Sequence, residues 1–191
     1  MNEKYRINVV YPILGMIISI VGMVIALDWQ GRVWWCKVGD LSPWSSDIWT
    51  THNSQHLLDP YTFTHILHGV LFFWITNWIL SDYRLRWKFL LVILAECCWE
   101  LLENSNMIIE RYRTVTISLD YFGDSILNSL ADVLSCALGA FIAYKLKFWK
   151  SLIYFALTEI ILLFWLRDNL TLNIIMLIYP IEAIKQWQGG A

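Results

Sequence analysis

Two apolar stretches of the sequence carry carboxyl and amide side chains at helical spacing. They are Glu96, Glu100 and Glu103 in the first stretch, and Asp124, Asn128 and Asp132 in the second. Intervals of three and four residues place the members of each stretch on one face of a helix. An ionisable group inside a membrane span costs at least about 2.5 kcal/mol on the insertion scale, so it needs a partner, a water-filled cavity or a function. These two rows are therefore the first candidates for a functional site.

The four histidines of the chain lie within 17 residues of one another. His65 and His68 share a helical face because they are three residues apart, and they follow His52, His56 and Asp59. Imidazole and carboxylate groups together bind zinc, iron or manganese, so we predict a metal-assisted or acid–base site with a divalent transition metal as its cofactor. The predicted metal ligands are His65, His68, His56 and Asp59, and the predicted catalytic groups are Glu100, Glu103, Asp124 and Asp132.

Two arginines and two asparagines are candidates for substrate binding. A guanidinium fork matches the geometry of phosphate, so we expect an anionic head group to be bound here. The residues concerned are Arg111, Arg113, Asn104 and Asn128. A structural interpretation stays open beside this one, in which the carboxyl groups pair with arginines and histidines and hold helices together. Interhelical hydrogen bonds of this kind contribute roughly 0.6 to 2 kcal/mol each.

The composition indicates that membrane helices position these side chains. The chain has 191 residues, of which 58% are hydrophobic and 16% charged, and its mean hydropathy is +0.50. A soluble domain carries about a quarter charged residues, so this chain has too little polar surface to face water on all sides. Its net charge of -2 and the lack of a long basic run exclude the electrostatic pattern of a nucleic-acid-binding protein. We expect an integral membrane protein whose main partner is the lipid bilayer.

The apolar runs predict an all-α, polytopic transmembrane helical bundle of about six spans, in one integral membrane domain over residues 1–191. The spans are residues 9–27, 62–80, 89–109, 121–144, 151–166 and 170–184. The tryptophan-rich loop 28–61 is expected to lie along the outer surface of the membrane. Placing both termini in the cytoplasm leaves nine basic residues inside and five outside, as the positive-inside rule favours. In this topology spans two, three and four bring their polar side chains to the outer leaflet.

Several motifs resemble an uncharacterised family of bacterial integral membrane proteins, the domain of unknown function 2585. The motifs are residues 54–61, 65–69, 99–105, 110–113 and 120–132. They occur in order, and the resemblance covers about two-thirds of the chain. It implies a multi-pass protein of the bacterial inner membrane and implies no particular activity.

The polar pattern is also similar, more weakly, to that of VanZ-like membrane proteins. Those proteins place an Asp and a His at the start of one span, a Glu in the next, and an Asp followed by a Gly in the one after. The corresponding positions are Asp59 with His65, Glu100 with Glu103, and Asp132 with Gly139. This resemblance implies a role in envelope lipids or the cell wall.

These patterns favour a metal-assisted or acid–base enzyme, a hydrolase or transferase, acting on a lipid or lipid-linked substrate at the outer leaflet. A small transporter or a proton or ion pathway is the alternative, because Glu96 and Asp132 lie deeper than a surface site requires. A homodimer would supply the further spans that a transporter needs. A structural envelope scaffold is the third interpretation.

Overall fold

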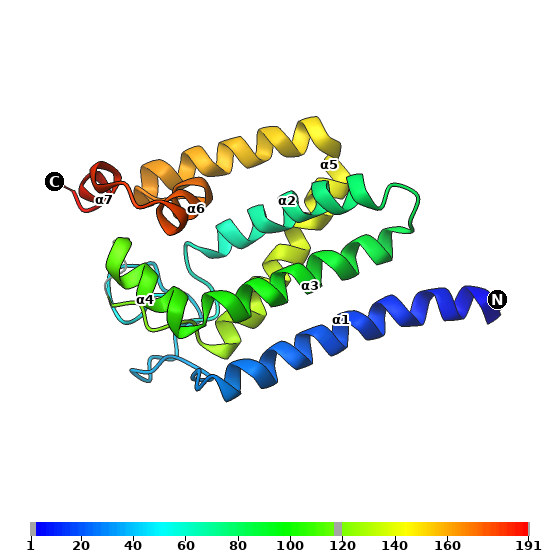
Figure 1. The fold of residues 1–191 in the computed structure, drawn as a ribbon, viewed down its shortest axis with the longest axis horizontal. Coiled ribbons are helices and arrows are strands. Elements are labelled where there is room, and N and C mark those ends of the chain that lie inside the picture. The colour runs from blue at the N-terminus through cyan, green and yellow to red at the C-terminus, as the bar shows by residue number, and fades with distance from the viewer. Residues whose placement is uncertain (1–2, 117–119, 191) are drawn as a thin grey trace.

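The computed structural model describes residues 3–116 and 120–190, with side chains from Val10 onward, so the side chains of Lys4 and Arg6 lie outside the described ones. Within these limits the chain forms seven helices and no strand, apart from an isolated bridge between Trp44 and Leu58 (Figure 1). The helices are α1 (Glu3–Trp29), α2 (Thr62–Ile79), α3 (Leu85–Glu103), α4 (Asn106–Val115), α5 (Ile126–Leu166), α6 (Leu170–Ile178) and α7 (Glu182–Gln188). The prediction of an all-α fold is confirmed.

α5 consists of two arms that meet at Lys147. The backbone of Lys147 has a φ of 61° and a ψ of 176°, which are not helical values. In Figure 1 the first arm, yellow-green to yellow, crosses the bundle, and the orange second arm runs back. The indole nitrogen of Trp74 on α2 donates a hydrogen bond to Ser151 Oγ at 3.0 Å, which places the second arm against α2. The two arms correspond to the predicted fourth and fifth spans.

Two glycines let α2 and the first arm of α5 touch through their backbones. A Cβ added at Gly69 would overlap the carbonyl oxygen of Cys136, and one added at Gly139 would overlap that of Ile66. Small residues at such contacts are typical of helix pairs in membranes. An apolar cluster fills the adjoining space between α2, α3 and α5, and it consists of Val70, Phe73, Val92, Cys136, Ala140 and Ala143. The glycine contact therefore fixes α2 against α5 at the level of the polar residues of both helices.

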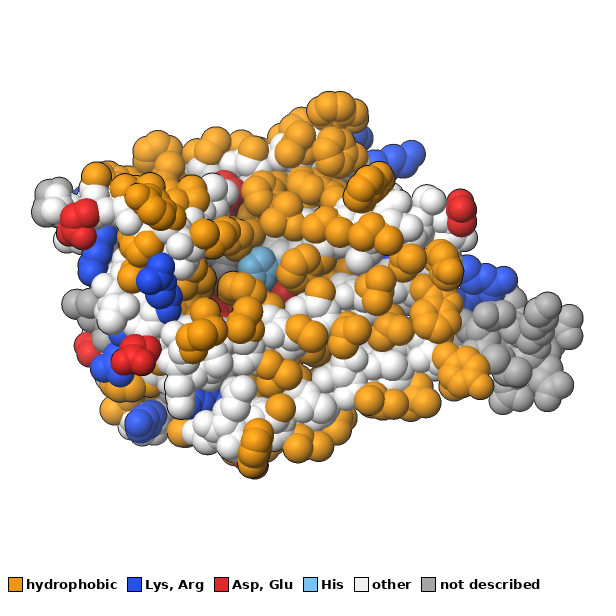
Figure 2. Space-filling view, in the orientation of Figure 1, with side chains coloured by type: hydrophobic (Ala, Val, Ile, Leu, Met, Phe, Trp, Pro, Cys, Tyr) orange, Lys and Arg blue, Asp and Glu red, His pale blue; other side chains and the backbone are white. Residues whose placement is uncertain are grey.

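Hydrophobic side chains cover the middle of the face drawn in Figure 2, and Lys, Arg, Asp and Glu gather toward its two ends. By length and composition, α1 and α5 are apolar enough to cross a membrane. α3 carries more charged residues than α1 or α5 does over a comparable length, because it contains Arg86 and Lys88 in addition to its three glutamates. These features are consistent with membrane association.

The predicted sixth span, residues 170–184, is wrong as a continuous helix. α6 ends at Ile178 and α7 begins at Glu182, and Pro180 between them has no backbone N–H to continue a helix. The nine residues of α6 rise only about 13.5 Å, which is less than half of a hydrocarbon core of about 30 Å. α1 begins at one end of the molecule and α7 lies at the other (Figure 1). The structure therefore does not support the prediction that both termini lie on one side.

The predicted third and fourth spans each extend past a helix cap. Ser105 accepts a hydrogen bond from the backbone N–H of Ile108, so a new helix, α4, starts there and α3 does not continue. Ser125 accepts one from the backbone N–H of Asn128, so α5 starts at Ile126, later than the predicted residue 121. The predicted third span therefore includes the start of a second helix, and the predicted fourth span includes non-helical residues before its N-cap.

Residues 30–61, which we call the cap segment, fold over one end of the bundle. The carbonyl oxygen of Ser54 accepts a hydrogen bond from the backbone N–H of Ser125 at 2.9 Å. Gln55 Nε2 donates to the carbonyl oxygen of Gly123 at 2.6 Å. The loop predicted to lie along the membrane surface is thus, in part, a folded cover over the start of α5.

Candidate functional site

Five ionisable side chains from α2, α3 and α5 meet in the interior, and we call them the central cluster. They are His65, His68, Glu96, Glu100 and Asp132, and all are buried. The spacing of three residues on α2 and four on α3 turns each pair toward the same side of its helix. The glycine contact between α2 and α5 then brings the histidines close to the aspartate of α5.

Glu96 lies between the two histidines. Its carboxylate accepts hydrogen bonds from Nδ1 of His65 at 2.6 Å and from Nδ1 of His68 at 3.2 Å. A carboxylate on Nδ1 holds the orientation and tautomer of an imidazole and leaves the lone pair on Nε2. Nε2 of His65 faces Asp132 and lies 3.9 Å from its Oδ2. The arrangement provides two oriented imidazoles that share one buried carboxylate.

Several buried polar atoms next to these histidines have no hydrogen-bond partner among the described residues. They include both carboxylate oxygens of Glu100 and Oδ1 of Asp132, although Oε1 of Glu100 lies 3.4 Å from His65 Nδ1. Within the same part of the chain, the side-chain oxygen and nitrogen of Asn128 also lack partners. A buried polar atom without a partner costs about 1–3 kcal/mol, and such atoms commonly bind water or an ion. The unpartnered oxygens of Glu100 and Asp132 are therefore available to accept a hydrogen bond from a ligand or to bind an ion.

Two overlapping groups of side chains in this region have the geometry to hold a metal ion. Donor atoms of His65, His68 and Glu96 lie within 4.8 Å of one another, and so do those of His65, Glu100 and Glu103. Imidazole nitrogen and carboxylate oxygen are ligands that suit zinc, iron and manganese. His65 thus meets two of the predicted catalytic carboxylates, Glu100 and Glu103, whereas among the described residues His68 groups with His65 and Glu96 alone.

The other two predicted metal ligands lie apart from this group. His56 groups with Cys36 and His52, in the cap segment. Asp59 lies at the start of α2, where its Oδ1 accepts hydrogen bonds from two backbone N–H groups at 2.7 and 3.1 Å. Burial, together with the charge of Asp124, raises the pKa of Asp59 to about 6. The four predicted metal ligands are therefore not brought together as one set.

A cavity of about 40 Å³ lies beside the central cluster, which is room for about two or three water molecules. His65, His68, Trp99, Glu103 and Asp124 line it, and apolar side chains of α6 form another part of its wall. In Figure 2 a histidine is visible in a hollow of the hydrophobic face, where α2 and α3 run side by side. The side chains of His65 and His68 are each 8% exposed. The histidines therefore lie between the buried carboxylates and the outside.

Asn104 and Asp124 form a reciprocal pair at the wall of this cavity. Asn104 Nδ2 donates to Asp124 Oδ2 at 2.8 Å, and the backbone N–H of Asp124 donates to Asn104 Oδ1 at 2.7 Å. The hydroxyl of Tyr121 donates to Asp124 Oδ1 at 2.9 Å. Asn104, predicted as a head-group ligand, thus positions a carboxyl group at the junction of α3 and α5.

The two arginines predicted to bind a head group are not among the described residues that line the cavity. Arg111 donates from Nε to the carbonyl oxygen of Leu177 at 3.1 Å and from Nη2 to that of Ile178 at 3.5 Å. These carbonyls end α6, so Arg111 caps that helix. Arg113 lies over the ring of Phe122, 5.2 Å from its centroid.

Asp168 and Tyr112 are among the cavity residues that the sequence did not predict. Asp168 accepts hydrogen bonds from the hydroxyl of Tyr61 at 3.1 Å and from Gln188 Nε2 at 3.0 Å. Burial raises the pKa of Asp168 to about 6. Burial beside Glu103 raises the pKa of Tyr112 as well. A carboxyl group directly after the fifth apolar run was the available signal for Asp168, but nothing in that run shows that the chain turns inward.

Comparison with known proteins places the chain in a family. It matches the family described as "Protein of unknown function (DUF2585)" over residues 27–190. A UPF0314 protein of Rhizobium etli is 44% identical over 190 residues, covering 99% of this chain and 97% of that protein. A UPF0314 protein of Brucella anthropi is 44% identical over 180 residues (93% and 91%), and one of Paracoccus denitrificans is 38% identical over 179 residues (94% and 93%). No solved structure matches the chain. The resemblance seen in the motifs is thereby confirmed, and the chain belongs to the DUF2585 family of uncharacterised bacterial proteins.

Proposed function

We propose that the protein is an integral membrane enzyme, a hydrolase or transferase, that uses His65 and His68 as acid–base groups on a lipid or lipid-linked substrate. The observation that carries this proposal is that Glu96 accepts hydrogen bonds from Nδ1 of both histidines. An imidazole held in this way has Nε2 available to take or give a proton. Both rings also line the cavity, where a reacting group would have to sit.

A metal-assisted form of the same reaction uses the same side chains. A metal-binding histidine commonly donates its second ring N–H to a carboxylate, which is the contact that both histidines make with Glu96. Asp132 would supply a further oxygen ligand, because its Oδ2 faces Nε2 of His65 at 3.9 Å and its Oδ1 has no hydrogen-bond partner among the described residues. Bound zinc, iron or manganese would lower the pKa of a water molecule and so provide a nucleophile.

The hydrophobic surface around the site supports a lipid substrate. The hollow in which a histidine is visible is surrounded by hydrophobic side chains in Figure 2, so a lipid could reach it sideways from a bilayer. The cavity itself has room only for a small reacting group, and the acyl chains would remain outside it. A water-soluble substrate would not need an entrance on this face.

The topology that we propose has five passes, formed by α1, α2, α3 and the two arms of α5, in the bacterial inner membrane. Counting α7 with the outer side moves Lys185 outward and changes the balance of basic residues from nine against five to eight against six. The excess stays on the cytoplasmic side, as the positive-inside rule favours. The cap segment and the cavity then lie at the outer leaflet.

A proton or ion pathway is the second candidate function. It is favoured by the position of Glu96, Glu100 and Asp132, which lie behind the histidines and are not among the described residues that line the cavity. Acidic groups inside a membrane bundle often mark such a pathway. Two histidines that act as an acid–base pair need one carboxylate to orient them, and the cluster contains three carboxyl groups. The additional ones are what a proton or ion pathway would use.

Lipid analysis of a deletion strain tests the enzyme proposal. The strain is complemented with the wild-type gene, with His68→Gln or with Glu96→Gln, and total lipid extracts are compared by mass spectrometry. Glu110→Gln on α4 is the matched control, since Glu110 is exposed and outside the cluster. We expect a lipid that accumulates without the gene to disappear with the wild type and with E110Q, and to persist with H68Q and E96Q.

The amount of each variant in the membrane fraction is measured in the same cells. Unchanged lipids in the deletion strain would contradict the enzyme proposal, and so would full restoration by H68Q and E96Q. Proton or ion flux in proteoliposomes that is lost in E96Q and Asp132→Asn would favour the pathway instead. Loss of folded protein in every polar variant, with no separable loss of activity, would favour the scaffold.

A further inference from the structure

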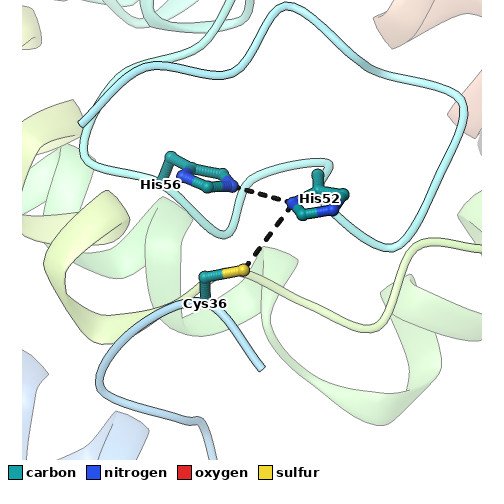
Figure 3. Close-up of side chains that lie close together, drawn as sticks. All are labelled: Cys36, His52 and His56. Atoms are coloured by element: carbon teal, nitrogen blue, oxygen red, sulfur yellow. Dashed lines mark hydrogen bonds between the residues drawn. The ribbon is translucent and has the colours of Figure 1, made fainter. Parts of the chain in front are cut away.

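We propose that Cys36, His52 and His56 form a zinc site in the cap segment, separate from the central cluster. Cys36 follows α1, and the two histidines come from the loop before α2 (Figure 3). Cys36 Sγ lies 3.7 Å from His52 Nδ1, and His52 Nδ1 lies 3.0 Å from His56 Nε2. All three donor atoms lie within 4.8 Å of one another, so two parts of the chain meet at a single point.

The separations between the donor atoms agree with tetrahedral zinc. Zn–N bonds of about 2.0–2.1 Å and a Zn–S bond of about 2.3 Å imply a nitrogen–nitrogen separation of about 3.3 Å and a sulfur–nitrogen separation of about 3.5 Å. The values for this site are 3.0 Å and 3.7 Å. Each differs from the ideal separation by only a few tenths of an ångström, and the third pair, Cys36 Sγ and His56 Nε2, lies within 4.8 Å. A thiolate with two imidazoles is also a donor set that zinc prefers.

A hydrogen bond behind His56 supports its role as a ligand. Nδ1 of His56 lies 2.6 Å from the carbonyl oxygen of Ser42, to which it can only donate. That contact leaves the lone pair on Nε2, which is the atom that faces His52. Metal-binding histidines commonly have such an outer hydrogen bond. Both His56 and Cys36 are buried, so these two donors are held in place before any ion binds.

Asp40 is the nearest candidate for the fourth ligand. Its Oδ2 lies 4.0 Å from His56 Nε2, and the side chain is half exposed. Its Oδ1 accepts a hydrogen bond from the backbone N–H of Ser42 at 2.9 Å, and its carbonyl oxygen accepts one from the indole nitrogen of Trp35 at 2.6 Å. A small movement of the carboxylate would complete a tetrahedral site, and a water molecule would complete it otherwise.

A zinc ion at this point would fix the cap segment over the cavity. Asn53 and Ser54 lie between the two histidine ligands in the sequence, and both line the cavity beside the central cluster. The segment has no helix of its own, and isolated backbone hydrogen bonds such as that from Ser125 N–H to the carbonyl oxygen of Ser54 hold it against the bundle. A metal site that closes the loop from Cys36 to His56 would reduce the entropy of the unfolded segment.

Metal titration of the purified full-length protein in detergent tests the site. Cobalt(II) is the probe, because a cysteine thiolate bound to cobalt gives a charge-transfer band, and zinc is then added to displace it. The variants are Cys36→Ser and His52→Gln. The matched controls are Cys98→Ser, which changes an exposed cysteine of α3, and His68→Gln, which changes the central cluster.

We expect one thiolate-bound cobalt ion per chain, identified by its charge-transfer band, in the wild type, in C98S and in H68Q; an ion at the central cluster would give no thiolate band. C36S should abolish the band, and both site variants should weaken binding by more than about 100-fold, since loss of even an outer-shell partner costs about 10–100-fold. The proposal is overturned if the wild type gives no thiolate band, or if C36S and H52Q bind as the wild type does. Cobalt binding that shows no thiolate band, is lost in H68Q and is kept in C36S would assign the metal to the central cluster and would also overturn the proposal. Because H52Q changes a partly exposed residue and leaves both buried donors in place, it keeps the test valid if C36S fails to fold.

Discussion

Replacing Glu96 by alanine should destabilise the bundle through the two histidines that it holds. Glu96 is fully buried, and its carboxylate accepts hydrogen bonds at 2.6 and 3.2 Å from His65 and His68. A hydrogen bond to a charged group contributes about 1.5–3 kcal/mol, and removing one partner of a buried pair costs about 3–5 kcal/mol. Two buried imidazole N–H groups lose their acceptor together in this variant. We therefore expect Glu96→Ala to lower the free energy of unfolding by about 3–5 kcal/mol.

Glu96→Gln separates the loss of charge from the loss of the side chain. The amide keeps one acceptor oxygen, so about half of the effect should remain, on the order of 1.5–2.5 kcal/mol. Glu110→Gln, at an exposed position of α4, should stay within about 0.5 kcal/mol of the wild type. Denaturant unfolding in detergent, followed by circular dichroism, measures all three variants. If Glu96→Ala unfolds within about 1 kcal/mol of the wild type, Glu96 does not hold the histidines and the acid–base proposal loses its basis.

Three further perturbations follow from the packing and the charges. Gly139→Val should separate α2 from α5, because its side chain would overlap the carbonyl oxygen of Ile66, and a loss of folded protein on size-exclusion chromatography would show it. Burial raises the pKa of Asp168 to about 6 from an ordinary 3.8, so the folded state binds this proton more tightly, and stability should fall as the pH rises from about 4 to 6. In Asp168→Asn that fall should be smaller by up to about 3 kcal/mol in denaturant unfolding at several pH values, and an unchanged pH profile would contradict the assignment. Arg111→Gln should remove the cap of α6 at a cost of about 1–2 kcal/mol in thermal unfolding and leave the lipid profile unchanged, whereas a changed profile would restore the predicted head-group role.

The convergence of α2, α3 and α5 on one cluster could be predicted because it depends on helical periodicity. Intervals of three and four residues fix which side chains share a face, and apolar runs fix which segments are helices. His65, Glu100 and Asp132 meet in the structure for this reason. Gly139 is a small residue of the kind that allows close packing of membrane helices, and in the structure it is one of the two residues that bring the helices close enough for the side chains to touch.

The contacts of irregular segments could not be predicted in the same way. The approach of Cys36 to His52 depends on the turns between them, and no periodicity encodes the path of such a segment. The sixth span failed for a related reason, since the local break at Pro180 outweighs the apolar composition around it. Arg111 illustrates the limit on function, because a guanidinium group can donate hydrogen bonds to phosphate or to backbone carbonyl oxygens, and only the fold decides which of them it meets.

The packing beyond the central cluster bears on the choice between an enzyme and an ion pathway. An ion or proton needs polar groups or water along its whole route through a membrane protein. On the side of the cluster away from the cavity, however, the described part of α2, α3 and α5 is closed by the backbone contact at Gly69 and by an apolar cluster that includes Val70 and Phe73. Phe73 also packs edge-on against Phe89 and Tyr144, with ring centroids 6.0 and 6.1 Å apart. Transport would require α2 and α5 to separate at the glycine contact. An enzymatic reaction needs access from one side only, and the two histidines are accessible from the cavity. The geometry therefore favours the enzyme proposal over the pathway.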